Sequence, residues 1–239
     1  MPRRPAGGSS PAPVPADHGR LARVLERCGD GWRLDYEAVR RSSDLAAYRR
    51  EIAAVDPDAL DGADRLAFWI NAHNASLLAL VAERMPVSSP LEIDGAFTRV
   101  RMHVARRDMT LRDMARAAGG HPLAWAGLSR ACVGSAPLRA YDGAALDAEL
   151  RGNARRYLAD RRCGARAAGR RRVLVTRAAL WAAGEIAPVP GLPAAIARGL
   201  AAVRPRRLLA PLRPLLPEPL AEARRLGFLP YDWSVNGGA

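Results

Sequence analysis

The stretch LAFWINAHNASLLALV, residues 66–81, decides the fold that the sequence predicts. At 3.6 residues per turn, its apolar side chains cover almost the whole surface of a helix. A helix that is apolar nearly all round is normally buried, so we expect it at the centre of the molecule. Asp61 and Asp64 precede it at the spacing of a capping box, and Met85-Pro86 is expected to end it.

Two amides and an imidazole interrupt the middle of this helix: Asn71, His73 and Asn74. Buried amides and imidazoles destabilise a fold unless they are hydrogen-bonded, so each needs a partner elsewhere. Two interpretations are open: a structural network that fixes other segments to the helix, or the lining of a polar cleft. We expect these groups to bind the C-terminal segment YDWSVN, residues 231–236, with Asp232 accepting hydrogen bonds and the two distant ends of the chain joined.

The elements on either side of this helix predict an α+β fold: a mostly helical single domain with a small β-sheet and a buried central helix. Thr110 and Asp113 form a capping box at the start of a short helix. The other expected helices cover residues 19–28, 35–54, 143–159, 194–203, 208–216 and 219–226, and the expected strands cover residues 97–104 and 170–176.

The 239 residues, 49% of them hydrophobic, are enough to bury the core of one domain, which we place at residues 19–239. Residues 1–18 are rich in Pro, Gly and Ser and contain no apolar signal segment, so a disordered tail with a solvated His18 is expected. No uninterrupted apolar run of about 18 residues predicts a transmembrane segment. We expect a soluble, cytoplasmic protein.

The cysteines, Cys28, Cys132 and Cys163, are few and widely spaced. They form neither a zinc-ligand pattern nor a disulfide framework, which is typical of a reducing compartment. The histidines lack spaced carboxylate or thiol companions, so no metal and no other cofactor is expected.

Every basic residue of the chain is an arginine: 37 of them against 24 acidic residues give a net charge of +13. The absence of lysine and the abundance of Ala, Gly and Pro are typical of GC-rich coding, which explains the charge without a function. A basic surface can nevertheless attract anionic surfaces or nucleic acid. The densest run, residues 151–173, has Tyr157 as its only aromatic residue, so nucleic-acid binding is not the expected main function. Its candidate anion-binding residues are Arg161, Arg162, Arg166, Arg170, Arg171 and Arg172.

Two segments, LAFWINAHNA (residues 66–75) and FLPYDWSVN (residues 228–236), resemble the first and last signatures of the domain of unknown function 547 family. The order of the segments between them is also similar, and the resemblance spans about residues 34–236. We expect the residues of these two motifs to form a polar network or cleft. Its members would be Trp69, Asn71, His73, Asn74, Tyr231, Asp232, Trp233 and Asn236.

The resemblance gives no established activity, but usual members carry a glutamate-histidine pair, a second histidine and a cysteine. Such a set could support a thiolate nucleophile with its base. In this chain the pair is replaced by Ala115 and Arg116, the second histidine by Trp125 and the cysteine by Ser135, while His73 stands where the first motif usually has tyrosine. The departures imply a non-catalytic member that acts as a binding or scaffolding module for a protein or a small molecule.

A catalytic alternative remains open. Cys132 lies three residues before Ser135, and His73 could supply an imidazole, with Asp232 or Asn236 to orient it. Such a set would give a thiol- or serine-dependent hydrolase or acyltransferase.

Overall fold

The computed structural model describes residues 16–191 and 193–237. In chain order the helices are α1 (His18–Cys28), α2 (Tyr36–Arg41), α3 (Ser43–Ala54), α4 (Gly62–Arg84), α5 (Leu111–Ala117), α6 (Leu146–Ala159), α7 (Arg177–Trp181), α8 (Ala183–Ile186), α9 (Ala194–Val203) and α10 (Arg206–Leu212). The strands are β1 (Met102–Val104), β2 (Arg107–Met109), β3 (Ala165–Ala167), β4 (Arg172–Val175) and β5 (Arg225–Phe228). Short 3-10 helices connect them: η1 (Pro57–Ala59), η2 (Pro90–Glu92), η3 (Ala124–Ala126), η4 (Gly143–Ala145), η5 (Arg213–Leu215) and η6 (Leu220–Glu222).

The central helix is α4, as the sequence predicts. Its residues 67–82 are all buried, and α1, α2, α3 and α5 pack against it. The Asp61 side chain caps its first turn by accepting from the Asp64 backbone N–H at 2.8 Å. The mostly helical α+β architecture around a buried helix is therefore confirmed.

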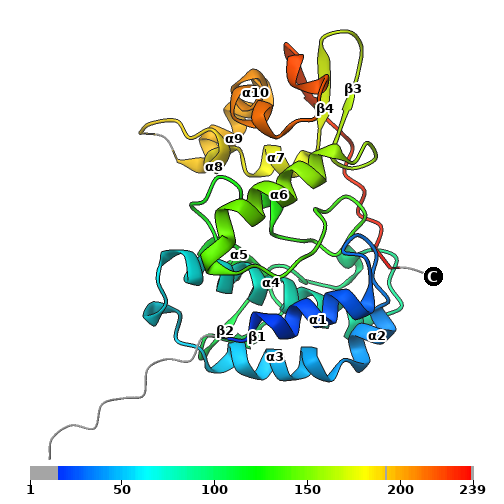
Figure 1. Ribbon diagram of the computed structural model, residues 1–239, viewed down its shortest axis with the longest axis vertical. Coiled ribbons are helices and arrows are strands. Elements are labelled where there is room, and N and C mark those ends of the chain that lie inside the picture. Colours follow the sequence, from blue (N-terminus) through cyan, green and yellow to red (C-terminus); the bar gives the residue numbers. More distant parts are fainter. Residues whose placement is uncertain (1–15, 192, 238–239) are drawn as a thin grey trace, which may run out of the picture.

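The strands form two small sheets instead of one. β1 and β2 are an antiparallel hairpin, whereas β3 pairs antiparallel with β4, and β4 pairs parallel with β5. Figure 1 shows α1, α2 and α3 at one end of the molecule and α9, α10 and the β3–β4 hairpin at the other, with α6 between them.

Several predicted boundaries are wrong for local reasons. The single helix expected at residues 35–54 is divided at Ser42, whose extended backbone ends α2 and whose side chain caps α3 by accepting from the Leu45 N–H. The strand expected at 97–104 is confined to β1, because turns occupy residues 94–99. The helix expected at 219–226 is only the short η6, followed by β5, whose pairing partner β4 is distant in sequence.

The first helix also begins one residue earlier than expected. Asp17 caps α1 by accepting from the Gly19 N–H, and His18 is the first residue of that helix. The His18 Nδ1 lies 2.7 Å from the Tyr48 hydroxyl, and burial lowers the pKa of the imidazole. His18 is therefore not solvated, while residues 1–15 of the expected tail lie outside the described residues.

Candidate anion-binding site

The two asparagines of α4 bind the backbone of one long loop. Asn71 donates from Nδ2 to the Tyr141 carbonyl oxygen (2.8 Å) and accepts at Oδ1 from the Tyr141 N–H (2.9 Å). Asn74 donates to the Gly127 carbonyl oxygen (2.8 Å) and accepts from the Ser129 N–H (3.0 Å). The expectation that these amides bind residues 231–236 is wrong, because the loop supplies a donor and an acceptor to each amide.

A third asparagine, which the sequence did not single out, holds the same loop from the other side. Asn153 of α6 is buried, and its Nδ2 lies 2.7 Å from the Ala126 carbonyl oxygen and 2.8 Å from that of Pro137. It also lies 2.9 Å from the Tyr141 hydroxyl. The loop at residues 126–141 is therefore fixed by side chains of both α4 and α6.

The C-terminal segment is fixed by the fourth asparagine, Asn236, and not by Asp232. Asn236 accepts from the Tyr36 hydroxyl (2.7 Å) and donates to the Trp32 carbonyl oxygen (3.0 Å). Asp232 is exposed, and its side chain accepts from the nearby Ser234 N–H at 2.9 Å. Distant ends of the chain do meet, but the expected role of Asp232 as the acceptor for buried donors is wrong.

The loop and the C-terminal segment bring Cys132, Ser135 and Tyr231 together. The Cys132 Sγ lies 3.3 Å from the Ser135 Oγ, which in turn lies 3.3 Å from the Tyr231 hydroxyl. The Ser135 Oγ also accepts from the Arg130 N–H at 2.9 Å. Burial raises the pKa of the Cys132 thiol, although these hydrogen bonds oppose the shift. The cluster thus holds neutral hydroxyl and thiol groups in a buried setting.

Among the residues that the structure describes, no base is hydrogen-bonded to this cluster. The His73 Nδ1 lies 3.2 Å from the Asn74 Oδ1, and among the described residues no hydrogen bond joins His73 to Cys132 or Ser135. Burial lowers the pKa of His73 to about 4, and the positive charge of Arg130 contributes to the same shift. Neither Asp232 nor Asn236 contacts the imidazole through a hydrogen bond. The structure does not assemble the expected thiolate pair.

Beside this cluster lies a cavity of about 490 Å³, which we call the arginine cavity. Its lining includes Ala115, Arg116 and Trp125, the positions at which the resemblance places the glutamate-histidine pair and the second histidine. Its charged lining residues are Arg112 and Arg116 from α5, Arg130 from the loop, Arg198 from α9, and a single acid, Glu185 from α8. Three of the four positions at which the resemblance places the candidate catalytic set therefore line a predominantly cationic cavity.

Arg130 is held in place by aromatic side chains. Its guanidinium carbon lies 4.6 Å from the ring centroid of Trp181 and 5.9 Å from that of Tyr231. Trp181 and Tyr231 pack on Trp233, with ring centroids 5.8 and 4.9 Å from its own. Within the described part of the chain, Arg130 makes no ion pair, so its half-buried charge is oriented but not neutralised by a carboxylate.

Trp125 contributes a hydrogen-bond donor that lacks an acceptor. The residue is 5% exposed and lines the arginine cavity, and its Nε1–H has no hydrogen-bond partner among the described residues. Buried donors are nearly always paired, and leaving one unpaired destabilises the fold by about 1–3 kcal/mol. Trp125 is therefore a lining residue of the arginine cavity whose buried indole donor is unpaired within the described residues.

The remaining predicted site residues lie elsewhere. Trp69 is a core residue, packed edge-on against Phe68 at 5.0 Å. Arg162 forms an ion pair with Asp160. Arg161, Arg162 and Arg166 are exposed and do not line the hollow that Arg170, Arg171 and Arg172 line at the far end of the molecule.

Among the described residues, no three His, Cys, Asp or Glu side chains are grouped to hold a metal ion. Within the same residues, no helix is both long and apolar enough to cross a membrane.

The fold and the cavity define a small α+β protein with an arginine-lined hollow between α5, the loop that follows it and helices α7 to α9. Residues 57–158 match the model of the family described as "Protein of unknown function, DUF547". The expected resemblance is confirmed over this segment, which contains α4, α5 and positions 115, 116, 125 and 135. The C-terminal signature lies outside the matched segment. No curated protein and no solved structure matches the chain.

Of the arginines that line the cavity, the sequence pointed only to Arg116, and only as the replacement of a family histidine. Arg112 and Arg116 stand four residues apart on α5, so one helix face carries both, and this spacing was a usable signal. No sequence pattern indicated that Arg130 and Arg198 line the same cavity, because this depends on how the loop and α9 pack around Trp181.

Proposed function

We propose that this protein is a non-catalytic binding module that takes a small molecule bearing a carboxylate or phosphate group in the arginine cavity. The observation that carries the proposal is the unpaired guanidinium of Arg130, stacked on Trp181 at 4.6 Å, beside the orphaned indole donor of Trp125.

The loss of catalysis is supported by the state of the nucleophile candidates. A serine hydroxyl or a neutral thiol is a weak nucleophile without an adjacent base. Cys132 has a raised pKa, and His73, whose pKa is about 4, is buried and bonded to Asn74. Ser135 donates to or accepts from only neutral groups: Cys132, Tyr231 and a backbone N–H.

The choice of an anion is supported by the charge and geometry of the lining. A guanidinium presents a planar fork of donors that matches carboxylate and phosphate oxygens, and its weak hydration suits it to partly buried sites. Stacking on Trp181 and Tyr231 restricts the orientation of Arg130 before a ligand arrives, which lowers the entropy lost on binding.

The size of the cavity indicates a small molecule. Ligand sites typically enclose about 300–1,000 Å³ and combine apolar walls with a few directed polar groups. The arginine cavity, of about 490 Å³, has Trp125, Leu128 and Trp181 as apolar walls. A cytoplasmic metabolite of that size is the ligand we infer, in keeping with the location expected from the sequence.

Isothermal titration calorimetry of the full chain tests the proposal, with inorganic phosphate, citrate and adenosine monophosphate as probes. We expect at least one probe to bind, and Arg130→Gln to weaken it by about ten- to a hundredfold, since hydrogen bonds to charged groups are worth about 1.5–3 kcal/mol. Arg50→Gln is the matched control, because Arg50 is an exposed arginine on α3 outside the cavity. Equal weakening by both variants would show that only general charge matters.

The catalytic alternative makes a different prediction for Cys132. An activated thiolate would be alkylated rapidly at neutral pH, whereas we expect slow alkylation with an apparent pKa above that of Cys in peptides, because burial raises it. Mass spectrometry of each alkylated cysteine over pH 6–10 measures this directly. Fast labelling of Cys132 at pH 6 would contradict the non-catalytic proposal and favour a hydrolase or acyltransferase.

A further inference from the structure

The positive charge of the chain is concentrated in one part of it. Residues 161–228 contain fourteen arginines and three glutamates, which accounts for +11 of the net +13. The other residues contain 23 arginines and 21 acidic residues and are nearly neutral. GC-rich coding explains why arginine replaces lysine, but it does not explain this segregation.

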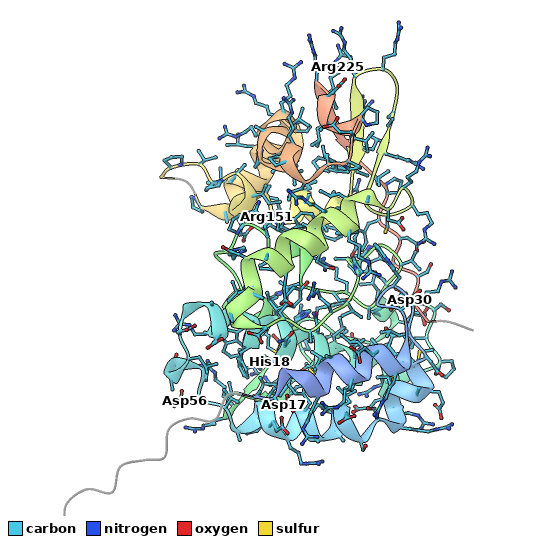
Figure 2. All side chains as sticks on the ribbon, in the orientation of Figure 1. Asp17, His18, Asp30, Asp56, Arg151 and Arg225 are labelled. Atoms are coloured by element: carbon cyan, nitrogen blue, oxygen red, sulfur yellow. The ribbon has the colours of Figure 1, made fainter. Side chains whose placement is uncertain are left out.

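The fold gathers most of these arginines at one end of the molecule. Two hollows of about 900 and 590 Å³ lie there, and Arg172, Arg206 and Arg225 line both. Figure 2 shows Arg225 at this end, beyond α10. Together the two hollows are lined by eight arginines, which we call the arginine end: Arg170, Arg171, Arg172, Arg204, Arg206, Arg207, Arg224 and Arg225.

Strand pairing forces these residues together although they are distant in sequence. Arg172 of β4 stands directly opposite Arg225 of β5 in the parallel register, and the Arg171 carbonyl oxygen accepts from the N–H groups of both Arg224 and Arg225. All eight arginines are exposed, no acidic residue lines either hollow, and within the described residues none of the eight forms an ion pair. Mutual repulsion of such a cluster is relieved by a partner with several negative charges.

An exposed apolar helix borders the arginine end. In α9, Ile196 is 50% exposed and Val203 is 77% exposed, and their seven-residue spacing places both on one helix face. Val203 lines the same hollow as Arg204, Arg206 and Arg207. An apolar helix face beside a dense group of cations is typical of segments that lie in the headgroup region of an anionic bilayer.

The lining lacks side chains that stack on bases. Neither hollow is lined by an aromatic residue, asparagine or glutamine, so only the arginines are there to contact a base edge. Nucleic acid would use only the arginines and leave Ile196 and Val203 in water, whereas a lipid surface uses both.

We propose that the arginine end docks on an anionic phospholipid surface. The eight arginines contact headgroup phosphates, and the side chains of Ile196 and Val203 enter the boundary between headgroups and acyl chains. The arginine end shares no lining residue with the arginine cavity, so the failure of one proposal would not affect the other.

Co-sedimentation of the full chain with vesicles tests the docking. We expect binding to vesicles of phosphatidylcholine with 30% phosphatidylserine, weakened by salt, and little binding to phosphatidylcholine alone. The double variant Arg206→Gln/Arg225→Gln should weaken vesicle binding about twentyfold or more, since each basic residue near such a surface contributes about a factor of five. The control double variant Arg50→Gln/Arg84→Gln carries the same charge change on α3 and α4 and should weaken binding less than threefold.

A second pair of variants separates lipid from nucleic acid. Ile196→Ser/Val203→Ser should reduce vesicle binding about tenfold while leaving retention on a 20-base-pair DNA duplex unchanged. Tighter binding to the duplex than to the vesicles at the same salt concentration would overturn the lipid assignment, as would vesicle binding that these variants leave unaltered. Arg130→Gln, which alters the arginine cavity, should not change vesicle binding.

Discussion

Two regions of the interior contain polar side chains: the four asparagines and the arginine cavity. They differ in whether the chain itself supplies the partners of those side chains. Asn71, Asn74, Asn153 and Asn236 are all buried, and each both donates and accepts, or donates several times, between segments far apart in the chain. In the cavity, the Arg130 guanidinium lacks a carboxylate and the Trp125 indole lacks an acceptor, as far as the described residues show.

The difference separates structure from function. A polar group whose partners all come from the chain stabilises the fold and needs no ligand. A buried donor left without a partner destabilises the free protein, and a ligand that supplies the acceptor recovers that loss. Substitutions of the two kinds of polar group should therefore differ in whether stability or ligand affinity is lost.

Removing an amide from the asparagine set should have the largest effect. Asn74→Ala leaves the Gly127 carbonyl oxygen and the Ser129 N–H unpaired in the interior, so we expect the free energy of unfolding to fall by about 3 kcal/mol. For a domain of this size, that corresponds to a melting temperature lower by roughly 9 °C. Thermal unfolding followed by circular dichroism measures it. Arg84→Ala, at an exposed position of the same helix, should change the stability by less than about 0.5 kcal/mol.

His73 should make the protein less stable in mild acid. Its pKa is about 4 in the folded protein, against about 6.5 in an unfolded chain. Between these values the unfolded chain binds a proton that the folded protein does not, so stability falls as the pH drops from about 6.5 to 4, by up to roughly 3 kcal/mol. Above pH 6.5 the imidazole is neutral in both states and contributes no pH dependence.

Urea unfolding of the wild type and of His73→Tyr at pH 7 and pH 4.5 measures this contribution. Other groups titrate in the same range, so the relevant quantity is the difference between the two proteins in their loss of stability. The variant should lose less stability than the wild type on acidification, whatever its stability at pH 7.

Trp125→Phe should behave in the opposite way to Asn74→Ala. It removes a buried donor that has no partner, so the unfolding free energy of the free protein should change by no more than about 1 kcal/mol. The affinity for the best-binding probe anion should nevertheless fall about five- to tenfold, because one hydrogen bond to the ligand is lost. If the variant lost stability but kept its affinity, Trp125 would have a structural role like that of the asparagines, and not a role in ligand binding.

The parts of the fold that follow from local signals are those that the sequence predicts well. The apolar run and its Asp61 cap define α4, the Thr110–Asp113 capping box defines the start of α5, and α9 has the expected limits. The boundary between α2 and α3 at Ser42 also has a local signal, because serine is a preferred N-cap. The apolar pattern continues on both sides of Ser42 and therefore predicted a single helix.

Contacts between segments that are distant in sequence could not be predicted from local patterns. Nothing in residues 225–228 indicates that they form a parallel strand with β4, and nothing beside Asn71 indicates that its partner is Tyr141, seventy residues away. Periodicity shows that a polar side chain is buried, but not which segment satisfies it. The resemblance pointed to positions 116 and 125, so the sequence located part of the candidate site. The role of Arg130 could not be predicted, because it depends on the packing of Trp181 in the folded protein.

Asp232 gives the smallest expected effect and tests the corrected assignment of the C-terminal segment. If Asp232 were the acceptor for the buried amides of α4, Asp232→Ala would lower the melting temperature by several degrees. The carboxylate is exposed and accepts one local hydrogen bond from Ser234, so the loss should be within about 0.5 kcal/mol. Asn236→Ala, four residues later, should be several times more destabilising, since it leaves the buried Tyr36 hydroxyl and the Trp32 carbonyl oxygen without their partner. Comparable losses in the two variants would contradict the assignment of the junction to Asn236.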